Sequence, residues 1–313
     1  MVAFDCKTTS LIICSSLTVL VSILYLSERW DEQRRNIVIG TRQIVDPSLQ
    51  FVAVKGKQNM YKKGQLFRRL YNGFLSDLYL ENEILVKTTN TSRTFMSAAM
   101  VLTGMYPPKN YQKWSNSETV WQPIPIYSNS PDRGTLIGSM GICPSIDSFA
   151  ANLSQIIDYS ADITALISFL SENCGQPINS RDVFLLYDLF LCSKAEGLSV
   201  PEWIKPYHLV TMKSISSKMS YRNTDDEDDD DFGGRGPLLN EIGSNMESRS
   251  NNYNTSRKMH LYSGHDISIG MAMSFLGHTI EWPGFGASLH FHMHHDVSNG
   301  YTVKVEINAP KNQ

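Results

Sequence analysis

The fold is decided by two stretches, ILVKTTNTSRTFMSAAMVL (84–102) and KMHLYSGHDISIGMAMSFL (258–276). In each one a short apolar run comes before a polar turn, and apolar residues at helical spacing follow the turn. Each stretch therefore predicts a strand, a turn and a helix, which is the unit from which α/β layers are built. The strands are expected at 84–86 and 259–262, the turns at 87–92 and 263–266, and the helices at 93–102 and 267–276.

The two turns carry side chains suited to phosphate chemistry. Lys87 and Arg93 flank the first turn, and His265 and Asp266 close the second. Parallel strands of one sheet place such turns along the same edge, where helix starts favour anions. Lys87 and Arg93 would clamp a phosphoryl group, and Asp266 would protonate a leaving alkoxide. Each residue also has a structural explanation, since Asp266 is a common helix cap and Arg93 a common surface charge.

The rest of the chain extends this α/β pattern and interrupts it once. Between the two stretches the periodicity is helical, with no convincing strand, and this predicts an all-α insertion. Two alternating strands joined by an Asn-Gly turn close the chain. Helices are expected at 56–79, 146–170 and 183–191, loops at 105–145, and the last strands at 287–293 and 301–307.

Charge argues against nucleic acid as a partner. The 313 residues include 28 Lys and Arg against 31 Asp and Glu, giving a net charge of −3. Seven of the acids form one run, 225–231, which is expected to be a solvated loop. Outside that run the net charge is +4 (−3 + 7), which suits a small anionic substrate.

The N-terminal region indicates the secretory pathway. Residues 9–26 are uncharged and apolar, at the lower limit for a membrane-spanning helix. They are equally compatible with a signal anchor and with a cleaved signal. Sequons at Asn90, Asn152 and Asn254 agree with a luminal glycoprotein. Five cysteines leave three beyond the apolar segment, so at most one luminal disulfide is expected.

Six blocks of the chain resemble the histidine acid phosphatases of the prostatic, lysosomal and insect-venom type. They occur in the family's order and cover most of residues 50–305. The blocks are GKQNMYKKGQLFRRLYNGFLSDLY (56–79), VKTTNTSRTFMSAAMVLTGMYPP (86–108), WQPIPIYSN (121–129), LLYDLFLCSKAEGLSVPEWI (185–204), GPLLNEI (236–242) and KMHLYSGHDISI (258–269).

The resemblance implies an α/β fold with a three-layer phosphatase-type core and an inserted all-α cap domain. It assigns residues 36–108 and 255–313 to the core and residues 109–254, with acidic loop 224–236, to the cap. Residues 1–35 would hold the signal sequence or anchor and a linker. It also implies hydrolysis of phosphate monoesters through a phosphohistidine, without a cofactor, on a lysosomal, extracellular or membrane-anchored luminal domain. Whether the chain forms a homodimer is left open.

By the same resemblance, His265 contacts the phosphate, Asp266 is the proton donor and Arg93 is the second phosphate-binding arginine. Lys87 stands where the family has the first arginine of an R-S-T-D-x-x-R-T motif, and Asn90 stands at its aspartate. No metal site is predicted, because His290 and His292 share a strand face but lack an identifiable third ligand.

One family feature is missing from this sequence. Family members begin with a strand ending in R-H-G, whose histidine attacks phosphorus. The chain has eight histidines, none before residue 208, and the corresponding region reads SILYLSERWDEQRRNIVIGTR (22–42). Two hypotheses follow. The first is an acid phosphatase that takes its nucleophile from elsewhere, or whose natural R-H-G exon is misrepresented in this sequence. The second is an inactive or impaired relative that binds anions or acts as an interaction protein. Whether Ile37–Ile39 replaces the lost strand is left open.

Overall fold

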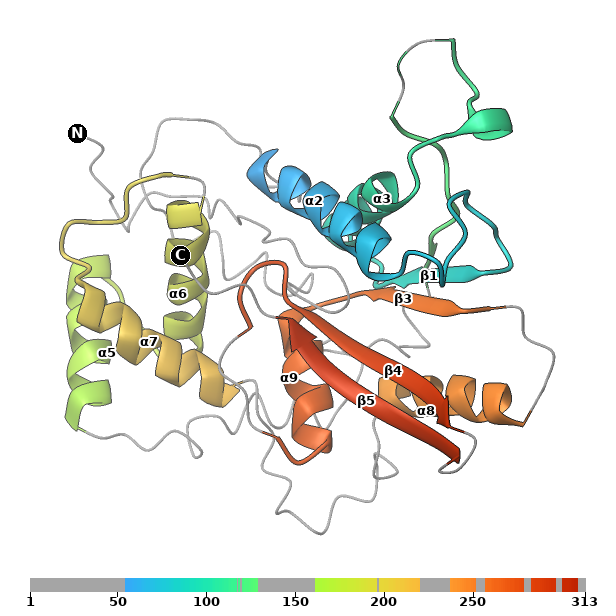
Figure 1. Cartoon of the computed structure of the whole chain (residues 1–313). Coiled ribbons are helices and arrows are strands. Elements are labelled where there is room, and N and C mark those ends of the chain that lie inside the picture. Colours follow the sequence, from blue (N-terminus) through green and yellow to red (C-terminus); the bar gives the residue numbers. More distant parts are fainter. Residues whose placement is uncertain are drawn as a thin grey trace.

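The computed structural model describes residues 54–116, 118, 120–128, 161–195, 197–219, 237–251, 257–278, 283–296 and 300–308 (Figure 1). The apolar stretch 9–26, the expected helix over 146–160, the acidic run 225–231 and the sequons at Asn152 and Asn254 lie outside these residues. Within them, no helix combines the length and apolar character needed to cross a membrane.

Helices and strands alternate at both ends of the described chain and helices alone fill its middle. The helices are α2 (Val54–Leu70), α3 (Ser92–Met105), the 3-10 helix η1 (Asn110–Gln112), α5 (Ala161–Cys174), α6 (Ser180–Ala195), α7 (Pro206–Met219), α8 (Pro237–Ser250) and α9 (Asp266–Phe275). The strands are β1 (Ile84–Thr88), β2 (Tyr127–Ser128), β3 (Met259–Ser263), β4 (Ser288–Asp296) and β5 (Gly300–Asn308).

The two expected strand–turn–helix units are present, and their strands are neighbours in one parallel sheet of order β2-β1-β3. Thr88 lies opposite Ser263, so β1 and β3 end side by side. Strand β1 is longer than the sequence predicts because Lys87 and Thr88 also pair with β2. The short strand β2 was not predicted, because the composition of residues 105–145 is typical of loops.

Helices cover both faces of this sheet and make the three-layer α/β core that the family resemblance implies. Ile84, Val86 and Leu261 pack against α2 and α3 on one face. Tyr262 packs against Leu238 of α8 and against residues of α9 on the other face. In Figure 1 the first pair of helices lies above the sheet and the second pair below it.

Strands β4 and β5 form a separate antiparallel sheet, as their alternation predicts. The pairing runs from Ser288 opposite Asn308 to Asp296 opposite Gly300. Strand β4 contributes Leu289 to the core around α8 and α9, whereas β5 is exposed along most of its length.

Helices α5, α6 and α7 bury a core of their own, which includes Leu170, Phe190 and Met212. This agrees with the expected all-α insertion, although α7 was not predicted as a helix. Two elements inside the range 109–254 contact the sheet instead: β2 pairs with β1, and α8 packs on β3.

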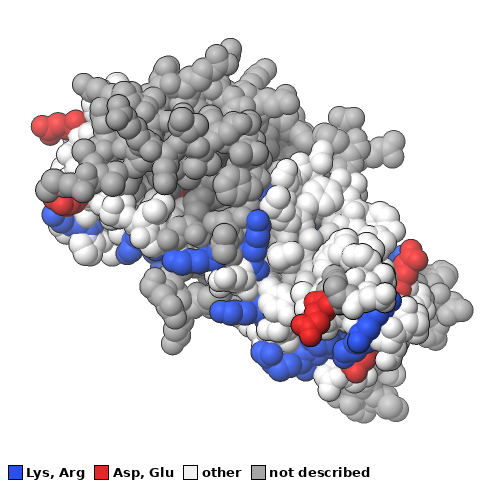
Figure 2. Space-filling model, turned by 90° about the horizontal axis from the view of Figure 1, so that it is seen from above, with Lys and Arg blue, Asp and Glu red and all other residues white. Residues whose placement is uncertain are grey.

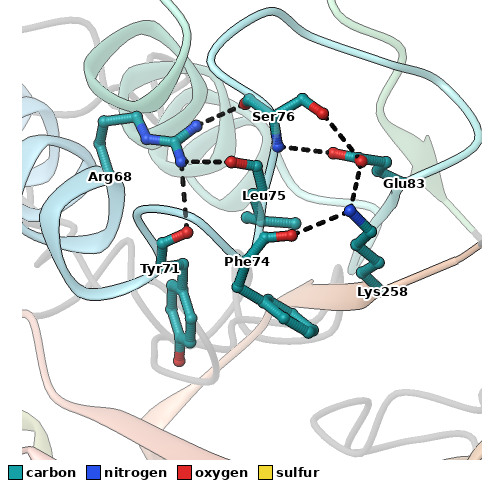
Figure 3. A network of polar contacts seen from close by, with 7 residues as sticks. All are labelled: Arg68, Tyr71, Phe74, Leu75, Ser76, Glu83 and Lys258. Atoms are coloured by element: carbon teal, nitrogen blue, oxygen red, sulfur yellow. Dashed lines mark hydrogen bonds and ion pairs between the residues drawn. The ribbon is translucent and has the colours of Figure 1, made fainter.

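Helix α2 ends at Leu70, nine residues before the end that the sequence predicts. Gly73, which follows Asn72, has φ +81°. A residue in this left-handed conformation ends a helix. The guanidinium of Arg68 donates hydrogen bonds to the carbonyls of Ser76 (2.6 Å), Leu75 (2.7 Å) and Tyr71 (3.3 Å), which holds the turn closed (Figure 3).

A buried carboxylate ties that turn to the starts of β1 and β3 (Figure 3). Glu83 accepts hydrogen bonds from the backbone N–H and hydroxyl of Ser76 (2.8 and 2.9 Å) and from the ammonium of Lys258 (2.6 Å). Burial acts to raise the pKa of Glu83, but the hydrogen bonds from Lys258 and Ser76 outweigh it and hold the pKa below its ordinary value. Because Glu83 precedes β1 and Lys258 precedes β3, the pair fixes the two strands at their entry.

Helices α2 and α3 cross at two glycines. A methyl group added to Gly104 would meet the carbonyl oxygen of Tyr61, and one added to Gly64 would meet the carbonyl oxygen of Val101. The two backbones are therefore as close as glycine allows, and α3 is held in a fixed position over the sheet.

We expect Gly104→Ala to lower the free energy of unfolding by about 2–3 kcal/mol, because the backbone at the crossing would have to move apart. Gly243→Ala is the matched control. A methyl group at this glycine of α8 meets nothing within 4 Å, so alanine should stabilise the helix by about 0.5–1 kcal/mol. Urea unfolding of the two variants measures both effects. Equal changes in the free energy of unfolding of the two variants would contradict the close crossing of α2 and α3.

Candidate functional site

The first turns of α3 and α9 meet at the carboxyl edge of the parallel sheet. Thr89 donates its backbone N–H to the carbonyl of Ser263 (3.1 Å), and the hydroxyl of Ser263 donates to the carbonyl of Thr94 (2.8 Å). Helix α3 starts immediately before Arg93, and α9 starts at Asp266 with His265 as its N-cap. The partial positive charge of two helix starts is thus directed to one edge of the sheet.

Hydroxyl groups hold the loop that presents Arg93. The hydroxyl of Thr94 donates to the carbonyls of Thr89 (2.8 Å) and Thr91 (2.9 Å) and also contacts the hydroxyl of Thr91 (2.8 Å). Asn90, the sequon residue, is exposed at the tip of the same loop. The threonine-rich sequence therefore fixes the loop by local side-chain to backbone bonds.

Three of the four residues predicted for the site are internal. Arg93, His265 and Asp266 are 2%, 1% and 3% exposed. Arg93 Nη2, His265 Nδ1 and Asp266 Oδ2 are all buried. The surface differs: in Figure 2 lysine and arginine side chains form a broken row with acidic side chains grouped toward its ends. The charge of Arg93 differs from these surface charges because its side chain is buried. Water screens its interactions with other charged groups less than it screens those of the exposed lysines and arginines.

The fourth residue, Lys87, is paired with an acid. Its ammonium contacts Glu241 of α8 at 2.7 Å, and the two side chains are only 23% and 18% exposed. Glu241 also accepts the hydroxyl of Tyr262 (2.8 Å), the residue opposite Lys87 in β3. The charge of Lys87 is thus compensated on the α8 side of the sheet, and its role in substrate binding stays a prediction.

Sequence reasoning missed Asp188, a buried residue of α6. Burial raises the pKa of Asp188 to about 7, while the positive charge of Arg93 and a hydrogen bond from Cys192 act to lower it. The helical insertion therefore places a titratable carboxyl within electrostatic reach of Arg93. The sequence carried a weak signal for it: Asp188 is the one acid within the apolar run LLYDLFL (185–191).

The described residues contain no cluster of three histidines, cysteines or acids placed to hold a metal ion. His290 and His292 share a face of β4, as their spacing predicts. Both contact the hydroxyl of Tyr71, at 2.8 Å from His290 Nδ1 and 2.9 Å from His292 Nε2.

Solved structures define the class of the fold as the α/β fold of phytases. Hafnia alvei phytase in its apo form is similar with a TM-score of 0.61, over 93% of this chain and 82% of that one, at 14% identity. The phytase from Citrobacter braakii is similar with a TM-score of 0.59, over 93% and 83%, also at 14% identity. At this identity the likeness concerns the fold.

The sequence narrows that class to a family. The model of the histidine phosphatase superfamily (branch 2) matches residues 50–308, and the chain belongs to this superfamily. Lysosomal acid phosphatase of Xenopus laevis is 27% identical over 80% of the chain and 60% of its own length. The human lysosomal enzyme is 26% identical over 80% and 61%, and mouse prostatic acid phosphatase is 24% identical over 82% and 70%. The chain thus spans about 60% of the length of the lysosomal relatives.

The raised pKa of Asp188 predicts a pH dependence of stability. The folded state binds this proton more tightly than the unfolded state, so the contribution is complete below about pH 4 and is lost as the pH rises through about 7. We expect the free energy of unfolding of the wild type to fall by about 1–3 kcal/mol more between pH 5 and 7.5 than that of Asp188→Asn. Urea unfolding at both pH values measures this. Asp162→Asn, at an exposed acid of α5, is the control and should follow the wild type.

Proposed function

We propose that the chain is an acid phosphatase-like protein that binds the phosphate group of small phosphate monoesters where α3 and α9 begin, and that its own hydrolytic activity is impaired. The observation that carries the proposal is the parallel, in-register pairing of β1 and β3. That pairing brings buried Arg93 and the His265–Asp266 pair to one edge of one sheet.

Binding needs positive charge and hydrogen-bond donors for the phosphate oxygens. In this proposal the guanidinium of Arg93 grips two of them, and the imidazole of His265 and backbone N–H groups of the helix starts contact the others. Asp266 holds the proton that would pass to the leaving alkoxide. The family resemblance assigns these roles, and the burial of all three residues supports them because electrostatic attraction is strongest away from water.

Covalent hydrolysis needs an attacking imidazole, which this chain does not supply before residue 208. Two of the described histidines, His208 and His260, pack against aromatic rings of the helical insertion and of β3. The ring of His208 packs on Phe169 with centroids 4.4 Å apart, and that of His260 stacks on Tyr262 at 6.4 Å. Removing a covalent nucleophile costs several powers of ten in rate, so binding without efficient turnover is what we expect.

The alternative is an active acid phosphatase. It is supported by the names of the relatives, lysosomal and prostatic acid phosphatase. The same names, with the apolar N-terminal stretch, support a place in the secretory pathway, whether lysosomal, extracellular or membrane-anchored. We further propose that α5, α6 and α7 form a cap beside the α/β core, since they bury their own apolar cluster.

Phosphate binding should depend on Arg93 far more than on other cations. We expect Arg93→Gln to weaken binding of inorganic phosphate at pH 5 at least about 100-fold, because a buried charge-assisted pair is lost. Arg69→Gln, at an exposed position of α2, is the matched control and should change the affinity less than about twofold. Isothermal titration calorimetry of the full chain measures both. Equal affinities of the two variants would place the phosphate elsewhere.

Turnover is tested separately on a chromogenic phosphate ester at about pH 5, with mouse prostatic acid phosphatase assayed in parallel. We expect the full chain to be at least about 1,000-fold slower and to form no acid-labile, base-stable phosphoenzyme with labelled substrate. Turnover at the rate of that enzyme together with such a label would establish the alternative, an active acid phosphatase.

A further inference from the structure

Two histidines of β4 each direct one ring nitrogen to the same oxygen atom. His290 Nδ1 lies 2.8 Å and His292 Nε2 lies 2.9 Å from the hydroxyl of Tyr71, which follows the end of α2. In Figure 3 the ring of Tyr71 points away from the Arg68 hydrogen bonds that hold this turn. The sequence shows the two histidines on one strand face, and the fold adds a third polar group from a distant segment.

The spacing of these groups is close to that of ligands around one metal ion. With bonds of about 2.0–2.1 Å, the ligand atoms of a tetrahedral zinc ion lie about 3.3–3.4 Å apart, and the centres of two bound imidazole rings about 5.2 Å apart. The ring centres of His290 and His292 are 5.6 Å apart. The hydroxyl of Tyr71 is nearer to both nitrogens than a shared ion requires by only about 0.5 Å, a shift that a small side-chain rotation supplies.

The second ring nitrogen of each histidine is also held. Metal-binding histidines usually donate this N–H to an oxygen atom, which fixes the ring and makes it a better ligand. Here His292 Nδ1 lies 3.2 Å from Glu306 Oε2, and His290 Nε2 lies 2.8 Å from the hydroxyl of Ser288. Phe67 packs edge-on against His290 with ring centres 5.4 Å apart. Both imidazoles are therefore oriented in advance, which lowers the entropic cost of binding an ion.

The surrounding charges balance a divalent ion. On binding, the ion takes the place of the phenol proton of Tyr71, which passes to water, and the resulting phenolate carries one negative charge. Glu306, opposite His290 in the hairpin, carries the second. Its other oxygen contacts Lys304 at 2.6 Å, which holds the carboxylate beside His292.

Tyr71, His290 and His292 all line a pocket of ≈ 770 Å³. The pocket gives an ion a path to the three groups and leaves room for a water molecule as the fourth ligand, as in open zinc sites. Arg93, His265 and Asp266 do not line this pocket, so the three groups are separate from the phosphate site proposed above.

We propose that Tyr71, His290 and His292 bind one divalent transition-metal ion of the zinc and copper class. Two imidazole nitrogens and one phenolate oxygen suit Zn²⁺ and Cu²⁺, whereas Mg²⁺ and Ca²⁺ prefer ligand sets made of oxygen alone. The bound ion would link the β4–β5 hairpin directly to the turn that follows α2.

Calorimetric titration of the full chain with Zn²⁺ at about pH 7.5, after treatment with a chelator, tests the proposal. We expect the wild type to bind one Zn²⁺ ion, and His290→Ala and His292→Ala each to weaken binding at least about 30-fold. His295→Ala is the matched control, because this histidine lies on the opposite face of β4 and packs on Tyr301, and it should leave the affinity within about twofold. A wild type that binds no Zn²⁺, or an equal loss in all three variants, would overturn the proposal.

The neighbouring His294 separates this site from simple chelation along the strand. It follows His292 on the same face, with ring centres 6.3 Å apart. We expect His294→Ala to bind Zn²⁺ as the wild type does, because Tyr71 and not His294 is the third ligand. A loss as large as that of His290→Ala would place the ion elsewhere on β4 and would refute the assignment.

Copper reports on the tyrosine itself and keeps the proposal testable if a histidine variant does not fold. A phenolate bound to Cu²⁺ gives an intense visible charge-transfer band, which copper bound by imidazoles alone lacks. We expect this band in the wild type with one equivalent of Cu²⁺, and its loss in Tyr71→Phe, which removes only the hydroxyl. Tyr301→Phe, at another tyrosine of the same pocket, should keep the band. A wild type without the band, or a band that survives in Tyr71→Phe, would exclude Tyr71 as a ligand and overturn the proposed site.

Discussion

The parallel pairing of β1 with β3 is the constraint on which the rest of the molecule depends. It joins segments 175 residues apart in register, from Ile84 opposite Met259 to Thr88 opposite Ser263. The Glu83–Lys258 ion pair fixes the entry of the two strands, and the Ser263 hydroxyl bonded to Thr94 fixes their exit. Because the side-chain period of a strand is two, a slip of one residue would exchange the faces to which Leu261 and Tyr262 point. The start of α9 would then lie away from that of α3.

The two cations predicted at this edge have different electrostatic partners. Lys87 is satisfied by Glu241 in a half-buried ion pair on the α8 side. Arg93 is almost fully buried within reach of Asp188, whose own burial raises its pKa to about 7. As the pH falls below this value, Asp188 becomes neutral and less of the positive charge of Arg93 is compensated from α6.

Local patterns in the sequence predicted the strands and helices that flank the site, and the family resemblance singled out Arg93, His265 and Asp266. What the sequence could not give depends on contacts between distant residues. The end of α2 was placed nine residues too late, because apolar spacing continued past the turn that Arg68 and Gly73 close. Strand β2 is only two residues long and exposed, so it has no apolar signature, and it exists because Lys87 and Thr88 pair with it. Asp188 reaches Arg93 only through the packing of α6.

Anion binding and hydrolysis place different demands on such a site. A phosphate is held by groups that need only be positive and fixed, and the buried arginine, the histidine and two helix starts can supply this from the described residues alone. Phosphoryl transfer through a phosphohistidine further requires an imidazole in line with the leaving oxygen, from a strand that ends at the same sheet edge.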